Sequence, residues 1–281
     1  TTNYQYDDLG HLKKIIHPAS DSTAWIATDS TFAPVLNTTE FGVGPGHWKQ
    51  SITTGRFRKD IVFDALWRPV VTSEWDTNAP AETRQVARQF DADGREVFAS
   101  YPTTGLGAFN AGSHAGVTKQ FDALGRLERT IASSEFGPQT TLITYDQLTN
   151  SKTITNPNQQ STTIQYLQYD SPSEDHPIAI SAPEGVNITI DRDVWGKPKF
   201  ITRSKTGGET ATRSFYYDTN QRLCKTVEPE RGAEVFHYDS ANRIDWNAAG
   251  YDVSTAAGCG DVSPALRILR TYDNRDRLTG V

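Results

Sequence analysis

The chain has 281 residues, a formal net charge of −6, 36% hydrophobic residues and 10% aromatic residues. Acidic and basic residues are interspersed, which argues against the basic patch of a nucleic-acid surface and against a polybasic membrane anchor. No apolar run approaches the ~18 residues that suggest a membrane-spanning helix, and a disordered chain would be poor in aromatic residues. Sheet faces built from aromatic and β-branched residues fit this composition better than one compact core.

One short motif recurs along the chain: an aromatic residue, Asp, two variable residues, a turn-forming residue, a basic residue and an apolar residue. Its clear copies are YDDLGHL from Tyr6, FDALWRP from Phe63, FDADGRE from Phe90, FDALGRL from Phe121, YDTNQRL from Tyr217, YDSANRI from Tyr238 and YDNRDRL from Tyr272. Weaker copies are YDQLTNS from Tyr145, YDSPSED from Tyr169 and RDVWGKP from Arg192. Consecutive copies begin 21 to 34 residues apart, except for an interval of 57 residues after the first copy. That interval is expected to hold one eroded unit or a long insertion around the Gly- and Pro-rich segment 41–48.

Each part of the motif suits a tight turn between two strands. The aromatic residue ends one strand, and the Asp carboxylate can accept the backbone N–H of the residue two positions on. The third position after the Asp needs a positive φ, which glycine adopts without strain. The glycines at this position are Gly10, Gly94, Gly125 and Gly196. The other residues there are Asn242 and Asp276, which tolerate turns, and Thr149, Trp67 and Gln221, which suit them less well.

The basic residue opens the following strand and can form a salt bridge with the Asp of its own or a neighbouring turn. At an exposed edge such a pair contributes only about 0–1 kcal/mol, so we expect it to fix register more than to stabilise. The residues predicted to build the repeat turns are Tyr6, Asp7, Gly10, Phe63, Asp64, Phe90, Asp91, Gly94, Arg95, Phe121, Asp122, Gly125, Arg126, Tyr217, Asp218, Arg222, Tyr238, Asp239, Arg243, Tyr272, Asp273 and Arg277.

Between the motifs, apolar and polar residues alternate as in β-strands. The segment 79–90 fits either two helical turns or a strand that enters the next motif, and we favour the strand. Each unit is thus a hairpin of about 20–30 residues, and ten units give on the order of 20 strands. The predicted fold is all-β: residues 1–281 form a single array of stacked hairpins in one long antiparallel sheet, which curls because large sheets twist.

The two cysteines, Cys224 and Cys259, are 35 positions apart and have no zinc-site spacing. Two interpretations remain open at this point. The two cysteines are either separate buried thiols or form a single disulfide that closes the Gly-rich segment around Cys259. A bridge over that span would stabilise the fold by about 3–4 kcal/mol.

No local pattern predicts a catalytic, metal or cofactor site. The six histidines lack the HxH or HxxxH spacing of metal ligands, and the Gly-rich segments 42–46 and 105–112 do not have the spacing of a phosphate-binding loop. The motif Asp residues recur too regularly to form one catalytic centre. We therefore expect a protein that is not an enzyme and has no cofactor or metal.

The YDxxGRL pattern at intervals of twenty-odd residues resembles the YD repeats of RHS proteins, from Tyr6 to Leu278. This family includes the C components of insecticidal toxin complexes, bacterial contact-dependent effectors, wall-associated proteins and teneurins. The resemblance implies a secreted or cell-surface bacterial protein whose sheet spirals into a hollow shell. In the toxins, the shell encloses a C-terminal toxic domain. The DPxGxxxG-like motif for self-cleavage in those toxins does not occur here, so no protease residue is carried over.

The sequence contains no Met, even at position 1, so we expect a section of a longer protein whose targeting signal lies elsewhere. Our first hypothesis is a section of a shell that encapsulates a C-terminal toxin, with further repeats and that cargo domain as its partners. The alternative is a cell-surface module that binds carbohydrate or a partner protein. Its tryptophans would then stack on a glycan, or else they pack within the sheet. These are Trp25, Trp48, Trp67, Trp75, Trp195 and Trp246.

Overall fold

The structure, a computed structural model, describes residues 1–18, 25–109, 111–168 and 173–281. Its regular elements are β-strands and four 3-10 turns, and the described residues contain no α-helix. The 3-10 turns are η1 (Pro80–Glu82), η2 (Ala111–Ser113), η3 (Pro183–Gly185) and η4 (Pro264–Leu266). Nothing within the described ranges is a helix long and apolar enough to cross a membrane. The predicted all-β class is confirmed: 21 strands belong to one antiparallel sheet, and two form a separate small sheet.

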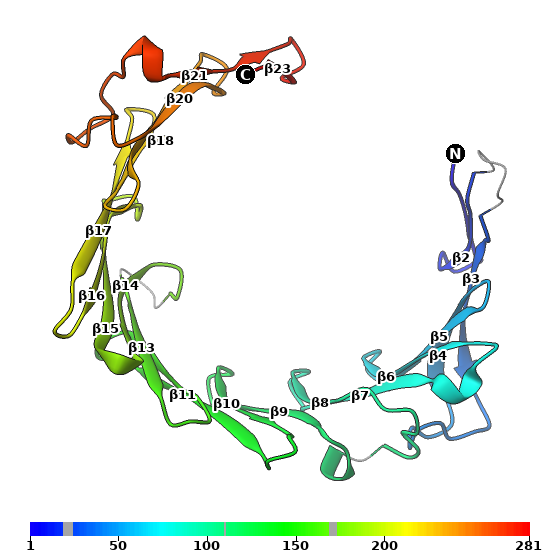
Figure 1. The fold of residues 1–281 in the computed structure, drawn as a ribbon. Helices are drawn as coiled ribbons and strands as arrows, with labels where there is room; N and C mark the ends of the chain where they lie inside the picture. Colours follow the sequence, from blue (N-terminus) through cyan, green and yellow to red (C-terminus); the bar gives the residue numbers. More distant parts are fainter. Residues whose placement is uncertain (19–24, 110, 169–172) are drawn as a thin grey trace. The chain divides into compact units, whose positions relative to one another are not determined.

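The first compact unit comprises Thr1–Leu142. Its strands are β1 (Asn3–Tyr6), β2 (Leu12–Ile16), β3 (Thr28–Val35), β4 (His47–Thr54), β5 (Phe57–Phe63), β6 (Pro69–Asp76), β7 (Arg84–Phe90), β8 (Glu96–Ser100), β9 (Gly116–Phe121) and β10 (Leu127–Ala132). The next strand, β11 (Gln139–Asp146), includes the last residues of this unit. Each strand from β1 to β10 pairs antiparallel with the next along the chain. The unit is therefore a meander, and its strands follow a curved path (Figure 1).

The second compact unit comprises Ile143–Val281. Its strands are β12 (Ser151–Thr155), β13 (Ser161–Tyr166), β14 (Pro177–Ala182), β15 (Val186–Arg192), β16 (Pro198–Lys205), β17 (Thr210–Tyr217), β18 (Leu223–Glu228), β19 (Gly232–Tyr238), β20 (Ile244–Gly250), β21 (Ile268–Leu269), β22 (Thr271–Tyr272) and β23 (Leu278–Gly280). Antiparallel pairing again joins successive strands, from β12 to β21, and β22 pairs with β23.

A β-bulge lies at the end of each clear motif hairpin. Phe63 pairs with Pro69, but the preceding residue Val62 pairs with Val71, so Val70 is an extra residue in β6. The same shift of register occurs in the other clear copies, which begin at residues 6, 90, 121, 217, 238 and 272. Because a bulge bends its strand and increases the local twist, its recurrence gives each unit a built-in curl.

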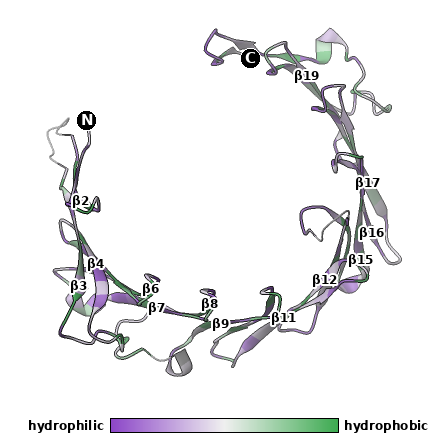
Figure 2. Ribbon diagram, turned by 180° about the vertical axis from the view of Figure 1, so that it is seen from behind, coloured by the Kyte–Doolittle hydropathy of each residue, from purple (hydrophilic) through white to green (hydrophobic). Residues whose placement is uncertain are grey.

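Most of the sheet is a single layer, and hydrophobic and hydrophilic residues are mixed along its strands (Figure 2). In the first unit, one face of β5, β6 and β7 is covered by the loops 36–46 and 101–109. Leu106 lies on the sheet residues Val62, Val71 and Ala87, all buried, and Phe109 packs beside them. The Phe109 N–H donates to the Phe41 carbonyl at 3.0 Å, which ties the two loops together.

In the second unit, the segment 251–267 covers one face of β19 and β20. Val253 and Val262 from this segment are buried against Val235, Trp246 and Ala248 of the sheet. Each unit thus has its own small core, made where a loop adds a second layer to the sheet.

Two segments that the sequence left open have clear structures. The segment 79–90 contains η1 and then β7, so its second half is the strand that we favoured. The 57-residue interval contains the hairpin of β3 and β4, whose connection 36–46 includes the Gly- and Pro-rich segment. The interval therefore contains both a hairpin without the motif and a long connection between its two strands. The weak copy at Tyr169 and Asp170 lies outside the described residues.

Candidate functional site

The repeated turns share one arrangement of hydrogen bonds around the Asp carboxylate. At Asp64, Oδ1 accepts the N–H groups of Leu66 and Arg68 at 2.9 and 3.0 Å, and Arg68 Nε donates to Oδ2 at 2.7 Å. The Asp64 N–H donates to the Arg68 carbonyl, which closes the loop. The same set recurs at Asp91, Asp122, Asp218, Asp239 and Asp273. At Asp7 and Asp193 the two backbone donors are kept, and His11 takes the place of Arg at Asp7.

The residue before the basic one has a positive φ whether or not it is glycine. Gly94 and Gly125 have φ values of 83° and 79°, while Trp67 and Gln221 have 64° and 63°. A left-handed conformation strains a side-chain-bearing residue by about 1–2 kcal/mol. The hydrogen bonds of the Asp carboxylate therefore impose the turn even where the residue is a poor turn former.

The basic residue of one turn also contacts the aromatic residue of the next motif. The cation lies 4.4 to 5.0 Å from the ring centroid in five such pairs, two in the first unit and three in the second. These pairs are Arg68–Phe90, Arg95–Phe121, Lys197–Tyr217, Arg222–Tyr238 and Arg243–Tyr272. Each such contact contributes about 0.5–1 kcal/mol at an exposed site. The pairs form a ladder along one edge of each unit, because the motif turns join alternate pairs of strands.

Polar contacts strengthen this ladder. Arg68 Nη1 donates to the Asp91 carbonyl at 3.0 Å, and Arg243 Nη1 donates to Asp276 Oδ1 at 2.7 Å. In the three ladder pairs whose ring belongs to Tyr, the hydroxyl donates back to the preceding turn at 2.9 to 3.0 Å. The hydroxyls and carbonyls are Tyr217 to Pro198, Tyr238 to Leu223 and Tyr272 to Ile244.

These contacts keep the turn carboxylates ionised. At Asp122, the backbone N–H of Arg126 is the main cause of a pKa held below its usual value. At Asp64, burial raises the pKa, but the backbone and guanidinium donors of Arg68 outweigh it and the net pKa is lowered. A carboxylate held in this way is a structural acceptor and not a proton donor at neutral pH.

One further turn was missed by the sequence reasoning. Asn156 accepts the Gln160 N–H on Oδ1 at 3.0 Å, and Gln159 has a φ of 62°. It has the geometry of the motif turn but lacks the aromatic, the Asp and the basic residue, so only the segment TNPNQQ could have signalled it. In the weak copy at Tyr145, the positive φ falls on Asn150 and not on Thr149, the position that the motif predicts.

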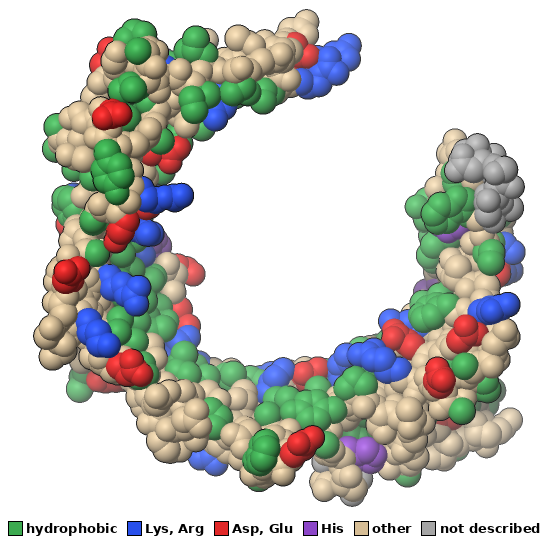
Figure 3. Space-filling view, in the orientation of Figure 1, with side chains coloured by type: hydrophobic (Ala, Val, Ile, Leu, Met, Phe, Trp, Pro, Cys, Tyr) green, Lys and Arg blue, Asp and Glu red, His purple; other side chains and the backbone are tan. Residues whose placement is uncertain are grey.

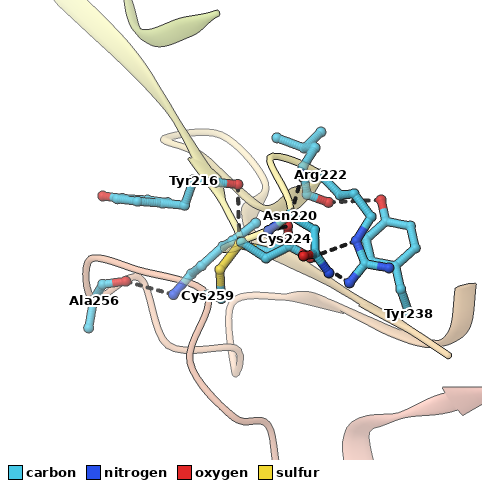
Figure 4. The surroundings of a disulfide bond; sticks show 10 residues. Tyr216, Asn220, Arg222, Cys224, Tyr238, Ala256 and Cys259 are labelled. Carbon is cyan, nitrogen blue, oxygen red and sulfur yellow. Dashed lines mark hydrogen bonds and ion pairs between the residues drawn. A yellow bond between two sulfur atoms is a disulfide. The ribbon is translucent and has the colours of Figure 1, made fainter. Parts of the chain in front are cut away.

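Cys224 and Cys259 form a disulfide with a Cα–Cα distance of 5.3 Å (Figure 4). Cys224 is the extra residue of the β-bulge opposite Tyr217, since Tyr217 pairs with Leu223 and Tyr216 with Lys225. The bridge pins the segment 251–267 to β18. A second tie is the ammonium of Lys225, which donates to the Ala256 carbonyl at 2.7 Å.

The structure divides the six tryptophans by their surroundings. Trp48 and Trp67 pack against each other and against Phe32 at 5.0 to 5.5 Å between ring centroids. Trp246 stacks on His237 at 5.2 Å and carries Arg267 at 4.4 Å. Trp25 and Trp195 are 68% and 64% exposed. Trp75 lines a cavity of about 720 Å³ in the first unit.

Charged side chains of both signs lie interspersed with hydrophobic ones on the face that Figure 3 shows. Within the residues that the structure describes, no three His, Cys, Asp or Glu side chains gather as metal ligands would. The described turns thus form a structural ladder, and the cavity beside Trp75 is a separate feature.

No known protein family matches the chain, and no curated protein is similar to it. Among solved structures, it is similar to a crystal structure of TcdB2–TccC3 without its hypervariable C-terminal region, with 11% identity and a TM-score of 0.29. It is also similar to a second TcdB2–TccC3 crystal structure at 12% identity and a TM-score of 0.25, and to the Photorhabdus luminescens Tc holotoxin pore at 11% and 0.24. Each of these matches covers 99% of this chain and 19% of the other. The chain thus spans about a fifth of the length of those proteins.

Proposed function

We propose that the chain is a structural section of an RHS-type β-sheet shell, which encloses and carries a C-terminal toxin domain of a secreted or cell-surface bacterial protein. The observation that supports it is the ladder of motif turns. Five of the turns contact the next motif through a cation over an aromatic ring, as at Arg95 and Phe121. Such an array grows by adding neighbours, so it can extend into a wall of any length.

The same turns support a role without catalysis. The carboxylates of Asp64, Asp91 and Asp122 are each bound by two backbone N–H groups and by an Arg of their own turn. Catalysis would need such groups to converge on one substrate, whereas here each is used within its own hairpin. We infer that the protein acts as a container and is not an enzyme.

Protease accessibility in the full polypeptide tests this proposal. One specific protease site would be introduced between Ser134 and Gly137, in the hairpin of β10 and β11 where Phe136 is 92% exposed. A second identical site would be introduced in the segment that follows the repeats. We expect rapid cutting at the first site and protection of the second until the protein is denatured.

Two outcomes would contradict the proposal. Equal cutting rates at the two sites would mean that the following segment lies outside any shell. A parent polypeptide that ends in a membrane anchor and has no further domain would favour the cell-surface alternative.

A further inference from the structure

The disulfide of the second unit borders a cavity that is open to solvent. Cys224 and Cys259 line this cavity of about 540 Å³ together with Arg222, His237 and Trp246. All of its lining residues belong to the second compact unit. The side chain of His237 is 53% exposed, so the cavity opens to water and a small molecule can reach the bridge.

The two cysteines of the bridge differ in exposure. Cys224, the extra residue of the β-bulge in β18, is only 3% exposed. Cys259 is partly exposed, in the loop between Gly258 and Gly260. A thiolate exchanges with a disulfide by attacking a sulfur atom that it can reach. Cys259 is therefore the point of attack, and Cys224 is the thiolate that leaves.

Few hydrogen bonds hold the segment 251–267 on the sheet. Among the described residues, its one backbone–backbone hydrogen bond to a strand runs from the Val253 N–H to the Gly250 carbonyl, at 3.4 Å. The ammonium of Lys225 adds a bond to the Ala256 carbonyl, at 2.7 Å (Figure 4). The segment otherwise rests on side-chain contacts, so the covalent bridge is its main tie to β18.

The covering loop of the first unit is held in a different way. Gln85 of β7 and Thr103 exchange two backbone hydrogen bonds, at 2.8 and 2.9 Å. The side-chain oxygen of Gln85 also accepts the Leu106 N–H at 2.8 Å. Hydrogen bonds thus anchor the first cover without a cross-link, whereas the second cover depends on its disulfide.

The segment 251–267 also keeps water away from a charged group. Lys225 is 2% exposed, and no carboxylate of the described residues forms an ion pair with it. Burial lowers the pKa of Lys225, which means that the covered site disfavours the ammonium. Lifting the segment would let water solvate this charge. Lys225 therefore favours an open segment once the bridge is broken.

We propose that the Cys224–Cys259 disulfide is a redox switch that small thiols open. In the oxidised protein the segment 251–267 covers β19 and β20. In the reduced protein it detaches and uncovers Val235 and Ala248, while the strands stay paired through their own backbone hydrogen bonds. The proposal does not rest on the shell function, since the segment and the face that it covers belong to one unit.

The reaction is a thiol–disulfide exchange in two steps. A thiolate attacks Cys259 Sγ and forms a mixed disulfide, while the electron pair of the broken bond leaves with Cys224 Sγ, which takes up a proton. A second thiolate attacks the ligand sulfur of the mixed disulfide and releases Cys259, which is protonated in turn. Two thiols are oxidised to one disulfide, and they supply the two electrons that reduce the bridge.

Acylation of Lys225 in the whole chain tests the proposal. The chain would be reduced with glutathione, freed of thiol by gel filtration without oxygen, acylated and mapped by mass spectrometry. We expect Lys225 to react about tenfold faster or more after reduction, because the segment no longer shields it. Lys49 is the matched control: it is bound to Glu40 beside the cover of the first unit and should react equally in both states.

Three further measurements separate the opening of the segment from unfolding. Peptide mapping of a sample quenched early in the reduction should find glutathione on Cys259. The double variant Cys224→Ser and Cys259→Ser should show the fast acylation of Lys225 and no response to thiol. In the reduced chain, the amides of β19 and β20 should keep the slow hydrogen exchange of paired strands.

The proposal is overturned if Lys225 reacts at the same rate after the bridge is reduced, or if the bridge stays intact in ~10 mM glutathione. Glutathione on Cys224 instead of Cys259 would contradict the point of attack. Loss of slow exchange in β19 and β20 together with the exposure of Lys225 would also overturn it, because the bridge would then hold the sheet itself.

Discussion

The two compact units use the same turn but reinforce it differently. In the first unit the clear copies of the ladder end in Phe, as at Phe90 and Phe121, and the core is covered by two loops that pack together without a covalent bond. In the second unit the ladder residues are Tyr, whose hydroxyls bond back to the preceding turn, and one disulfide fixes the covering segment. A single-layer sheet thus needs local reinforcement, which packing or cross-linking can supply.

Removing the disulfide should have the largest effect on stability of the changes that test this difference. We expect reduction, or the double substitution of Cys224 and Cys259 by Ser, to destabilise the second unit by about 3–4 kcal/mol, because the 35-residue separation is no longer closed in the unfolded chain. Chemical unfolding followed by hydrogen exchange would measure it unit by unit. Equal losses in both units would show that the cross-link does not act locally.

Weakening the core of the first unit should destabilise that unit by a comparable amount and leave the second unit unchanged. Leu106 is 2% exposed against Val62 and Val71. Leu106→Ala should cost about 2–4 kcal/mol through lost burial and the cavity left behind. Reductant should leave this loss unchanged, and exchange in β19 and β20 should stay as it was.

The turn conformation itself can be tested in both directions. Gly125→Val should destabilise its hairpin by about 1–3 kcal/mol, because φ is +79° there. Gln221→Gly in the equivalent position of the second unit should stabilise by about 1 kcal/mol, because it relieves the same conformation. Thermal unfolding of the two variants gives the comparison, and shifts of the same sign would refute the turn assignment.

The Tyr hydroxyls give a smaller and more specific contrast. Tyr238→Phe removes the hydrogen bond to the Leu223 carbonyl and should cost about 0.5–1.5 kcal/mol. Phe90 has no hydroxyl, so Phe90→Leu, which keeps an apolar side chain, isolates the loss of the ring under Arg68. If Tyr238→Phe unfolds like the unchanged chain, the hydroxyl bond contributes nothing to the ladder.

Acid should weaken both units to a similar, modest degree. The pKa of Asp64 and of Asp218 is lowered in the folded state because, although burial opposes it, the donors of Arg68 and Arg222 prevail. Their stabilising contribution is therefore complete above the unfolded pKa of about 3.9 and is lost as the pH falls below it through the lower folded pKa. Unfolding free energies between pH 6 and about 2 should show this decline, and Asp64→Asn should flatten it.

The sequence revealed the features that depend on neighbouring residues. The Asp of each motif bonds to backbone groups two and four positions on, so its signal is local and survives even where Trp67 replaces glycine. The Asn156 turn was hidden because Asn, Pro and Gln replace the recognisable residues. The bulge at Cys224 was also not predicted, although the same shift of register follows every clear copy of the motif.

Long-range features lay beyond the sequence. The contact of the Phe109 loop with Phe41 brings together segments about 70 residues apart, and no local pattern encodes it. The cavity beside Trp75 depends on that loop arrangement and on four strands. The sequence identifies Trp75 only as one of six tryptophans. It does not show which of them pack against other rings and which line a cavity.

Amide hydrogen exchange of the whole chain, resolved by residue with NMR, tests the central claim most directly. The claim is that the motif copies are the turns of successive hairpins, held by the Asp carboxylate. The N–H groups two and four positions after each clear motif Asp, such as those of Leu124 and Arg126, should exchange much more slowly than the N–H of Ala123, which directly follows Asp122. Uniformly fast exchange at these positions in the clear copies would contradict the turn arrangement and the shell section built on it.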